Sequence, residues 1–508
     1  MKTQHPHARR RRAQGALVAI FLVMGVLVFS FFRVQVVRSS TYMLQAESNR
    51  LRPLSVPAPR GTIFDRNGRI IADNIPGYAV TILPVGGRDS TLAILDRLRP
   101  YLPGLDSTRV RRLRQSFDRY PRQPLVVTMD AGFEAASALQ ERRSSFPNVF
   151  IEMRPKRRYA SPHAVSHVMG YIGEITSEEL GTEQFPREEY EQGMIIGKTG
   201  IERQYETILQ GEQGVRYVEV DAGGRIVGDF EGSLSKPGVA GGDIRLSVDL
   251  ELQEWIHRIF PDSMMGAVVA IDPADGGVLA LYSAPTFDPN AFVGGIDPQL
   301  WQQLNTDDNK PLYNRPVLGL YAPASTWKLA TAGIALDVGA VTPTERMPIP
   351  CTGGMNYGGR YWRCWRPGGH GYLDLAGAIQ HSCDVYFYQL GLRIGLDRLL
   401  EEATDVGFSQ RCGIDLPQEN QGIFPADREF WRQRFGYSPQ EGEVLSLSIG
   451  QGPNSQTPLK MAQFYTAIAR DGSAPASTYE FLAVHRDHIV VVVPAGPAAA
   501  AAEVQPAA

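Results

Sequence analysis

Two residues with the chemistry of a nucleophile and its base lie close together in this sequence. Ser325 and Lys328 are three residues apart in YAPASTWKLATAGIAL, at the start of a helix predicted over 324–338 from Pro323 and the apolar run that follows. Residues three apart share one face of a helix. A serine hydroxyl becomes nucleophilic when a neighbour takes its proton, and a lysine whose pKa is lowered can do so. Because Ser-x-x-Lys also arises by chance on helix surfaces, the context must decide.

A second group combines three of the four cysteines with one histidine. Its members follow the spacing C-x12-C-x5-H-x12-C and are Cys351, Cys364, His370 and Cys383. Three thiolates and an imidazole suit a tetrahedral, structural zinc ion. Two other interpretations remain open: a disulfide between Cys351 and Cys364 with Cys383 buried and inert, or core thiols throughout. We expect Cys412 to be a structural residue.

An N-terminal segment indicates where this chemistry takes place. Ala16 to Phe32 is an uncharged run long enough to span a bilayer, and Arg9 to Arg12 precede it. The positive-inside rule keeps the basic segment 1–14 cytoplasmic and sends everything after the anchor, 15–32, across the plasma (inner) membrane. A cleaved signal peptide is the alternative, but the apolar run is longer than usual and no small-x-small cleavage site follows.

Charge and motifs exclude several functions. The 508 residues include 51 Lys plus Arg and 54 Asp plus Glu, a net charge of −3 that offers no basic surplus for nucleic acid. The sequence has neither an H-E-x-x-H helix nor a dinucleotide-type glycine pattern after a strand. GMIIGKTG (193–200) lacks the first glycine of a phosphate-binding loop, so we interpret it as a structural turn.

The rest of the chain must position the nucleophile and the cysteine group. A mixed α+β region, 33–240, ends in the glycine-rich break KPGVAGGD, after which a strand, a helix and a β-hairpin over 266–285 are predicted. Further helices are predicted over 373–395 and 457–470. From 473 to 508 the composition becomes rich in Ala and Pro, with HIVVVVP as one possible strand.

Seven segments distributed over nearly the whole chain to about Asp471 resemble one family. They are RGTIFDRNGRIIADN (60–74), HVMGYIGEI (167–175), GKTGIERQYETILQGEQG (197–214), GAVVAIDPADGGVLALYSAPTFDPNAF (266–292), HSCDVYFYQLG (381–391), GIDLPQE (413–419) and SLSIGQG (446–452). Together with Ser-x-x-Lys they are typical of class B penicillin-binding proteins, and they are most similar to the elongation transpeptidases of the penicillin-binding protein 2 group.

The resemblance implies an α+β fold: a transmembrane helix, an elongated pedestal (33–240) and a serine transpeptidase domain (241–472) whose antiparallel sheet is flanked by helices. The family's second motif matches Ser382-Cys383-Asp384. Ser382 would relay protons between Lys328 and the leaving amine, and Asp384 would hold the lysine. Without the family, Ser382 and Asp384 could simply cap a helix over 384–391.

The family's third motif, Lys-Thr/Ser-Gly, has no match after Ser382; the one Lys-Thr-Gly, at 198–200, lies in the pedestal. In the family the strand carrying this motif supplies one of the two oxyanion-hole donors, and losing such a donor typically costs about 10² to 10³ in rate. We therefore expect a C-terminally incomplete transpeptidase domain with an unpaired sheet edge, produced by truncation or a change of reading frame before the tail 473–508.

The implied activity is D,D-transpeptidation of peptidoglycan stem peptides during cell elongation, with Ser325 acylated by the donor or by a β-lactam. Implied partners are a SEDS-type glycosyltransferase and scaffold proteins of the elongation complex. No cofactor is needed for catalysis, although some relatives with Cys at the position of Cys383 hold a metal there. The alternative is a non-catalytic member that regulates the glycosyltransferase through its pedestal; a β-lactamase or β-lactam sensor fits the long pedestal less well.

Overall fold

The computed structural model describes residues 6–37, 51–84, 87–102, 104–119, 121, 124–146, 148–220, 226–229, 235–470, 481–485 and 488–492. The chain forms two compact units. The first comprises Met1–Ala58, Pro76–Arg154 and Glu212–Val239, and the second comprises Pro59–Ile75, Pro155–Gly211 and Ala240–Ala508. Two segments of the predicted pedestal, 59–75 and 155–211, therefore pack with the transpeptidase part of the chain. The domain limits drawn from composition stay predictions.

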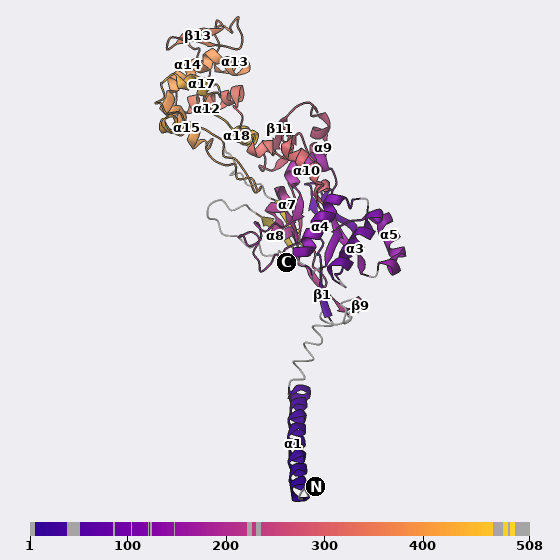
Figure 1. Ribbon diagram of the computed structural model, residues 1–508. Coiled ribbons are helices and arrows are strands. Elements are labelled where there is room, and N and C mark those ends of the chain that lie inside the picture. The colour runs from indigo at the N-terminus through magenta and orange to yellow at the C-terminus, as the bar shows by residue number, and fades with distance from the viewer. Residues whose placement is uncertain are drawn as a thin grey trace, which may run out of the picture. The chain divides into compact units, whose positions relative to one another are not determined.

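The N-terminal helix α1 (Pro6–Phe32) is continuous and ends in a short π-helical turn, η1 (Arg33–Val37) (Figure 1). Gln14–Gln35 is long and apolar enough to cross a membrane, with a mean hydropathy of 2.7. Its large apolar side chains are exposed; Phe21, for example, is 69% exposed. Such a surface is stable only when another apolar phase covers it, so this helix is a candidate membrane anchor.

Besides α1, the described residues of the first unit form two antiparallel groups of strands and three helices, and the second group packs with these helices around one core. The first group is β1 (Leu51–Val56), β8 (Gly214–Val220) and β9 (Ile226–Asp229). In the second, the C-terminal part of β3 (Ile70–Ile82) pairs with β4 (Leu125–Thr128), and β5 (Val149–Tyr159) pairs with β3. The helices are α3 (Arg88–Leu98), α4 (Ser107–Arg119) and α5 (Gly132–Glu141), with 3-10 turns η2 (Arg99–Tyr101) and η3 (Arg143–Ser145). Leu95, Leu98 and Val127 are among its fully buried side chains.

In the second unit a parallel strand pair joins segments distant in sequence. Strand β2 (Ile63–Phe64) runs parallel to β10 (Asp243–Arg245) and antiparallel to the start of β3. Strands β15 (Phe481–His485) and β16 (His488–Val492) continue antiparallel from β10, so the strand predicted within HIVVVVP is present. The low-complexity end of the predicted tail lies outside the described residues. Ile63, Ile71 and Ile244 are fully buried where these strands meet.

The predicted strand, helix and hairpin after the glycine-rich break are confirmed. Helix α9 (Leu250–Ile259) begins where the Asp249 side chain accepts a hydrogen bond from Leu252 N, an N-cap. β11 (Gly266–Ile271) and β12 (Val278–Ala284) form the antiparallel hairpin, with α9 against β12 and α18 (Pro458–Ala469) against β11. Within the described part of the chain, β11 pairs with no strand other than β12. The other elements here are α6 (Pro162–Met169), β6 (Ile172–Glu174), β7 (Ile195–Gly197), α7 (Gly200–Gln204), α8 (Glu206–Leu209), η4 (Pro289–Phe292), α10 (Pro298–Thr306) and α11 (Arg315–Leu318).

A helical region of the second unit surrounds the Ser-x-x-Lys segment (Figure 1). Its core includes the fully buried Trp327, Phe387 and Trp431. Its elements are η5 (Ala324–Trp327), α12 (Lys328–Asp337), β13 (Gly354–Tyr357), β14 (Arg360–Arg363), α13 (Leu375–Gln380), α14 (Asp384–Ile394), α15 (Leu396–Asp405), α16 (Glu429–Phe435) and α17 (Glu443–Ser448).

The single helix predicted over 373–395 was wrong. It is two helices, α13 and α14, separated by His381–Cys383, where Ser382 has φ of 49°. A non-glycine residue in this left-handed region interrupts a helix and carries strain that surrounding contacts must offset. The break redirects the chain so that Ser382 and Cys383 face different neighbours.

Candidate active site

Ser325 lies in a tight turn at the beginning of the predicted helix. The turn, η5, is a 3-10 helix that leads directly into α12, so the predicted helix start is confirmed with a different first turn. The residue before the nucleophile, Ala324, has φ of 49°, and its N–H donates to Gly450 O at 2.9 Å. Ser325 is in the first turn, where backbone N–H groups lack helical partners, so its amide can serve as an oxyanion donor.

Lys328 is buried beneath Ser325 and is surrounded by acceptors. Only 2% of it is exposed. Its Nζ lies 3.4 Å from Ser325 Oγ, 2.9 Å from Ser382 Oγ and 2.6 Å from Asp384 Oδ1. It also donates to the Ser382 carbonyl oxygen at 2.9 Å and lies 5.7 Å from the centre of the Phe387 ring. The Lys328 Nζ atom is thus fixed within reach of the hydroxyl groups of Ser325 and Ser382.

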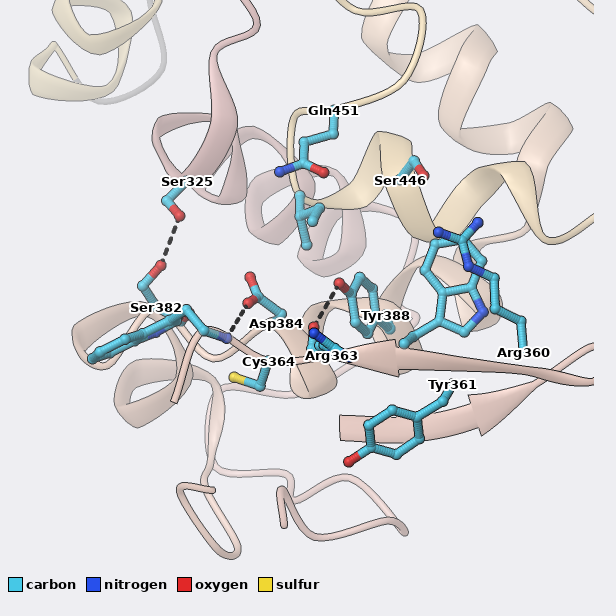
Figure 2. A pocket seen from close by; sticks show the side chains of 13 residues that line it. Ser325, Arg360, Tyr361, Arg363, Cys364, Ser382, Asp384, Tyr388, Ser446 and Gln451 are labelled. Atoms are coloured by element: carbon cyan, nitrogen blue, oxygen red, sulfur yellow. Dashed lines mark hydrogen bonds between the residues drawn. The ribbon is translucent and has the colours of Figure 1, made fainter. Parts of the chain in front are cut away.

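Ser382 completes a chain of hydrogen bonds to Ser325. Ser382 Oγ donates to Ser325 Oγ at 2.9 Å, although the residues are 57 positions apart (Figure 2). Asp384 is the first residue of α14, where a carboxylate is also favoured by the helix dipole. The structure therefore brings together all four predicted catalytic residues, Ser325, Lys328, Ser382 and Asp384.

The capping interpretation of the second motif does not describe this geometry. The residue at the N-cap of α14 is Cys383, and it makes no side-chain capping hydrogen bond. Asp384 uses one oxygen for Lys328 and accepts the Trp365 N–H on the other at 3.0 Å. Both oxygens of the Asp384 carboxylate are therefore hydrogen-bonded, one to Lys328 and the other to the loop after β14.

A pocket of about 740 Å³ opens beside these groups. Ser325, Ser382 and Asp384 form one part of its lining. The remainder comes from strand β14, the two residues after it, helix α14, and the end of α17 with the loop that follows: Arg360, Tyr361, Trp362, Arg363, Cys364, Trp365, Tyr388, Ser446, Ile449 and Gln451. A pocket of this size holds a ligand larger than one amino acid.

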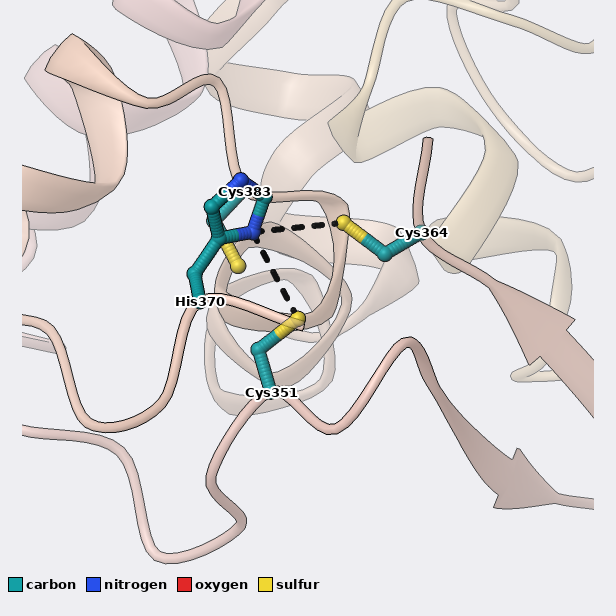
Figure 3. Close-up of side chains that lie close together, drawn as sticks. All are labelled: Cys351, Cys364, His370 and Cys383. Carbon is teal, nitrogen blue, oxygen red and sulfur yellow. Dashed lines mark hydrogen bonds between the residues drawn. The ribbon is translucent and has the colours of Figure 1, made fainter. Parts of the chain in front are cut away.

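The cysteine group also converges. The ligand atoms of Cys351, Cys364, His370 and Cys383 all lie within 4.8 Å of one another (Figure 3). His370 Nδ1 faces two sulfurs, those of Cys351 and Cys364, at 3.6 Å each. A zinc ion bound tetrahedrally at ordinary ligand distances would separate a nitrogen from a sulfur by ~3.6 Å. Donor types and spacing therefore both fit zinc.

No disulfide joins the thiols at this site, and a hydrogen bond between two of them shifts the pKa of each. All four cysteines are free, so the predicted alternative of a Cys351–Cys364 disulfide is not formed. A hydrogen bond from the Cys383 thiol lowers the pKa of Cys364 to about 4, and the same contact raises the pKa of Cys383. A thiolate is the form that binds a metal. Cys412 lies outside the group, and burial raises its pKa.

The segment that resembled a phosphate-binding loop, 193–200, is not a single turn: it contains the short strand β7 and ends where helix α7 begins. Lys198 forms an ion pair with Glu179, and Gly200 begins the five-residue helix α7. Gly200 has φ of 61°, and a Cβ there would lie 2.5 Å from Gly170 N. The glycine is therefore required by close packing of two backbone segments.

Two family models match the chain. Residues 55–246 match the penicillin-binding protein dimerisation domain, and residues 266–478 match the penicillin-binding protein transpeptidase domain. The peptidoglycan D,D-transpeptidase MrdA of Haemophilus influenzae is 34% identical over 471 residues, which cover 91% of this chain and 70% of that protein. This chain belongs to the class B penicillin-binding proteins. The MrdA protein of Escherichia coli K12 is also 34% identical, over 91% of this chain and 72% of its own length.

The solved structures that are similar to this penicillin-binding protein include PBP2 proteins. The Helicobacter pylori PBP2 in complex with MreC superimposes with a TM-score of 0.72 at 27% identity, covering 88% of this chain and 82% of that one. The Pseudomonas aeruginosa PBP2 in complex with WCK 5153 gives a TM-score of 0.56 at 31% identity, over 82% and 70%. The predicted fold class, an α+β pedestal and a transpeptidase domain, is confirmed.

The sequence did not point to several residues of this penicillin-binding protein's site. Trp365 donates from its indole Nε1 to the carbonyls of His381 and Ser382, at 3.1 Å each. One feature of the sequence could have pointed to Trp365, namely its position directly after Cys364. A zinc ligand at 364 would hold Trp365 near Cys383. Gly450 and Gln451, in SLSIGQG, were noted as family landmarks without a role.

Proposed function

We propose that this chain is a peptidoglycan D,D-transpeptidase that forms an acyl-enzyme on Ser325. The observation that carries the proposal is the hydrogen-bonded chain from Lys328 through Ser382 to Ser325, set in a pocket that can hold a peptide. The D,D-transpeptidase names of the MrdA relatives support it.

The first half-reaction forms the acyl-enzyme on Ser325 and releases D-alanine. Ser325 Oγ attacks the carbonyl carbon of the penultimate D-alanine, and Lys328, acting as its neutral amine, accepts the hydroxyl proton. When the tetrahedral intermediate collapses, the C–N bond breaks, Ser382 passes its hydroxyl proton to the departing D-alanine amine, and Lys328 returns the proton it had accepted to Ser382 Oγ. Asp384 and the Ser382 carbonyl hold Lys328 in place during these transfers. The Ser325 amide stabilises the oxyanion.

The second half-reaction reverses the roles. The amine of an acceptor stem peptide attacks the acyl-enzyme carbonyl, its proton goes to Lys328, and the ester bond to Ser325 Oγ breaks. Ser325 Oγ then takes this proton back from Lys328 through the hydrogen-bonded chain, and a cross-link between two peptides has formed. β-Lactams would acylate the same oxygen by opening of their ring.

Fluorescent penicillin provides the test. The detergent-solubilised full chain is labelled beside Ser325→Ala, with Thr326→Ala as the matched control from the same turn. Label that is present in the chain and in the control but absent from Ser325→Ala is expected. A folded, unlabelled chain would overturn the transpeptidase proposal and favour the alternative, a non-catalytic member that regulates a glycosyltransferase.

We also propose a structural zinc ion held by Cys351, Cys364, His370 and Cys383. With four protein ligands the ion would have no open position, so it would supply structure and no chemistry on the substrate. Cys364 follows β14 and Cys383 precedes α14, so these ligands would tie the hairpin to the Ser382 loop.

For location and partners, we propose a single-pass protein of the inner membrane with its N-terminus cytoplasmic and its bulk periplasmic. The four arginines before the apolar run support this orientation. A SEDS-type glycosyltransferase and elongation scaffolds are the proposed partners; among similar structures one is a PBP2 with MreC, and another belongs to a peptidoglycan synthase complex. Alkaline phosphatase fused after Ala469 should be active and fused after Ala13 inactive.

A further inference from the structure

The pocket beside Ser325 has a strongly basic part that the proposed reaction does not use. The β13–β14 hairpin contributes Arg360 and Arg363 to the lining (Figure 2). In that view Ser325 and Ser382 lie at one end of the pocket and Arg360 lies at the other. The hairpin thus presents its charges to the same space as the nucleophile, at a distance from it.

Neither of these two arginines forms an ion pair with a described residue, unlike three other arginines of this region. Arg393, Arg398 and Arg428 form ion pairs with neighbouring carboxylates. Among the residues that the structure describes, Arg360 and Arg363 form none. Asp384, the acidic residue in the lining, is already paired with Lys328. Two arginines that line the pocket therefore have no ion-pair partner among the described residues.

The Arg360 side chain is held in place, and so is the strand that carries both arginines. The Arg360 guanidinium lies 4.6 Å from the centre of the Trp362 ring, a stacking arrangement that arginine favours. The Arg363 carbonyl accepts the Tyr388 hydroxyl at 3.0 Å, which anchors β14 to α14. A fixed guanidinium group such as that of Arg360 loses little entropy when it binds, so it suits recognition of a planar carboxylate.

We infer that Arg360 and Arg363 bind a free carboxylate on the acyl side of the donor peptide, so that acidic stem peptides are preferred over their amidated forms. This inference rests on the proposed function, because Ser325 must be the nucleophile for the pocket to hold the donor. The exposed faces of Tyr361 and Trp365 provide apolar contact for the peptide between the two ends.

The test compares two peptide thioester donors that end in D-alanine and differ in one group, a side-chain carboxylate or the corresponding carboxamide. The measured quantity is the ratio of their rates of Ser325 acylation by the full chain. A charge-assisted bidentate contact predicts a ratio of about 10 to 100 in favour of the carboxylate. Arg360→Gln with Arg363→Gln should reduce this ratio to near one.

Arg366→Gln is the matched control, since Arg366 is exposed in the same loop but does not line the pocket. It should keep the ratio of the unmodified chain. A ratio near one in the unmodified chain, or an unchanged ratio in the double variant with a normal unfolding midpoint, would overturn the inference. If the double variant does not fold, Arg360→Lys and Arg363→Lys should lower the ratio partially, and an unchanged ratio there would overturn it too. Absence of penicillin label on the unmodified chain would instead indicate failure of the proposed function.

Discussion

Trp365 and Lys328 donate hydrogen bonds to the same atom, the carbonyl oxygen of Ser382. The indole Nε1 lies 3.1 Å from it and the lysine Nζ 2.9 Å. The Trp365 backbone N–H also binds Asp384, which in turn binds the lysine. Trp365 is thus a positioning residue for the groups that move protons, although it does not touch Ser325 Oγ itself.

Trp365→Phe should slow penicillin acylation by about 3- to 10-fold, because one hydrogen bond to the loop is worth roughly 1 kcal/mol. Trp365 is 63% exposed, so the unfolding midpoint should change little. The rate should also show an altered pH profile, since Lys328 loses part of its orientation. Trp301→Phe, at another exposed tryptophan, serves as the control. Equal effects of the two substitutions would contradict the positioning role.

Gly450→Ala should disturb the nucleophile turn. A Cβ at this position would lie 2.4 Å from Ala324 O and 2.5 Å from Trp327 Cβ, and Gly450 has φ of 71°. The strain predicts a loss of about 1–3 kcal/mol in the free energy of unfolding and a lower rate of acylation. Gly333→Ala is the control, since Gly333 lies in α12 with no atom near its added Cβ, and it should be neutral or slightly stabilising. Chemical denaturation and penicillin labelling of both variants measure these effects.

Removal of metal should destabilise the chain. Purified protein is expected to contain zinc in equimolar amount, and chelation should lower the unfolding midpoint by roughly 10 °C. Cys364→Ser should lose the zinc, whereas Cys412→Ser should keep it because Cys412 is outside the group. Elemental analysis decides the matter: protein purified without chelator that contains no zinc would refute the site.

Asp415 should make stability depend on pH. Burial raises the pKa of Asp415 to about 7, and the Tyr205 hydroxyl donates a hydrogen bond to the Asp415 carboxyl. The unfolded chain ionises this group near pH 4, so stability is fully present below pH 4 and is lost as pH rises toward 7, by up to about 4 kcal/mol. The stability of Asp415→Asn, measured relative to the unmodified chain, should therefore be greater at pH 8 than at pH 4. Asp405→Asn, at an exposed position, should show no such difference in denaturation curves.

The parts of the site that depend on local sequence could be predicted. Ser325 and Lys328 are one helical turn apart, so their pairing followed from spacing. Ser382 is 57 residues away, and its role was inferred from the family motif alone. The break before α14 was missed because the segment around Ser382 contains no proline or glycine, and the left-handed φ there is imposed by contacts made across the fold.

Residues that act through tertiary contacts could not be predicted from the sequence. Trp365 and Arg360 reach the pocket because the β13–β14 hairpin packs against α14, a relationship that no periodicity records. For the cysteine group, by contrast, spacing and donor types left zinc as one of three interpretations, and the four ligand atoms do lie close together. Whether metal fills the group stays a prediction.

Reaction at Ser325 reports whether the buried core around the active site has folded. Trp327 immediately precedes Lys328, Val385 immediately follows Asp384, and both belong to the same hydrophobic core. The reactive geometry at Ser325 exists only when that core has assembled around residues drawn from widely separated segments. The fraction of chains that react with penicillin in a cell would therefore report the fraction that have completed folding, and substitutions deep in the core would reduce that fraction without touching any reactive atom.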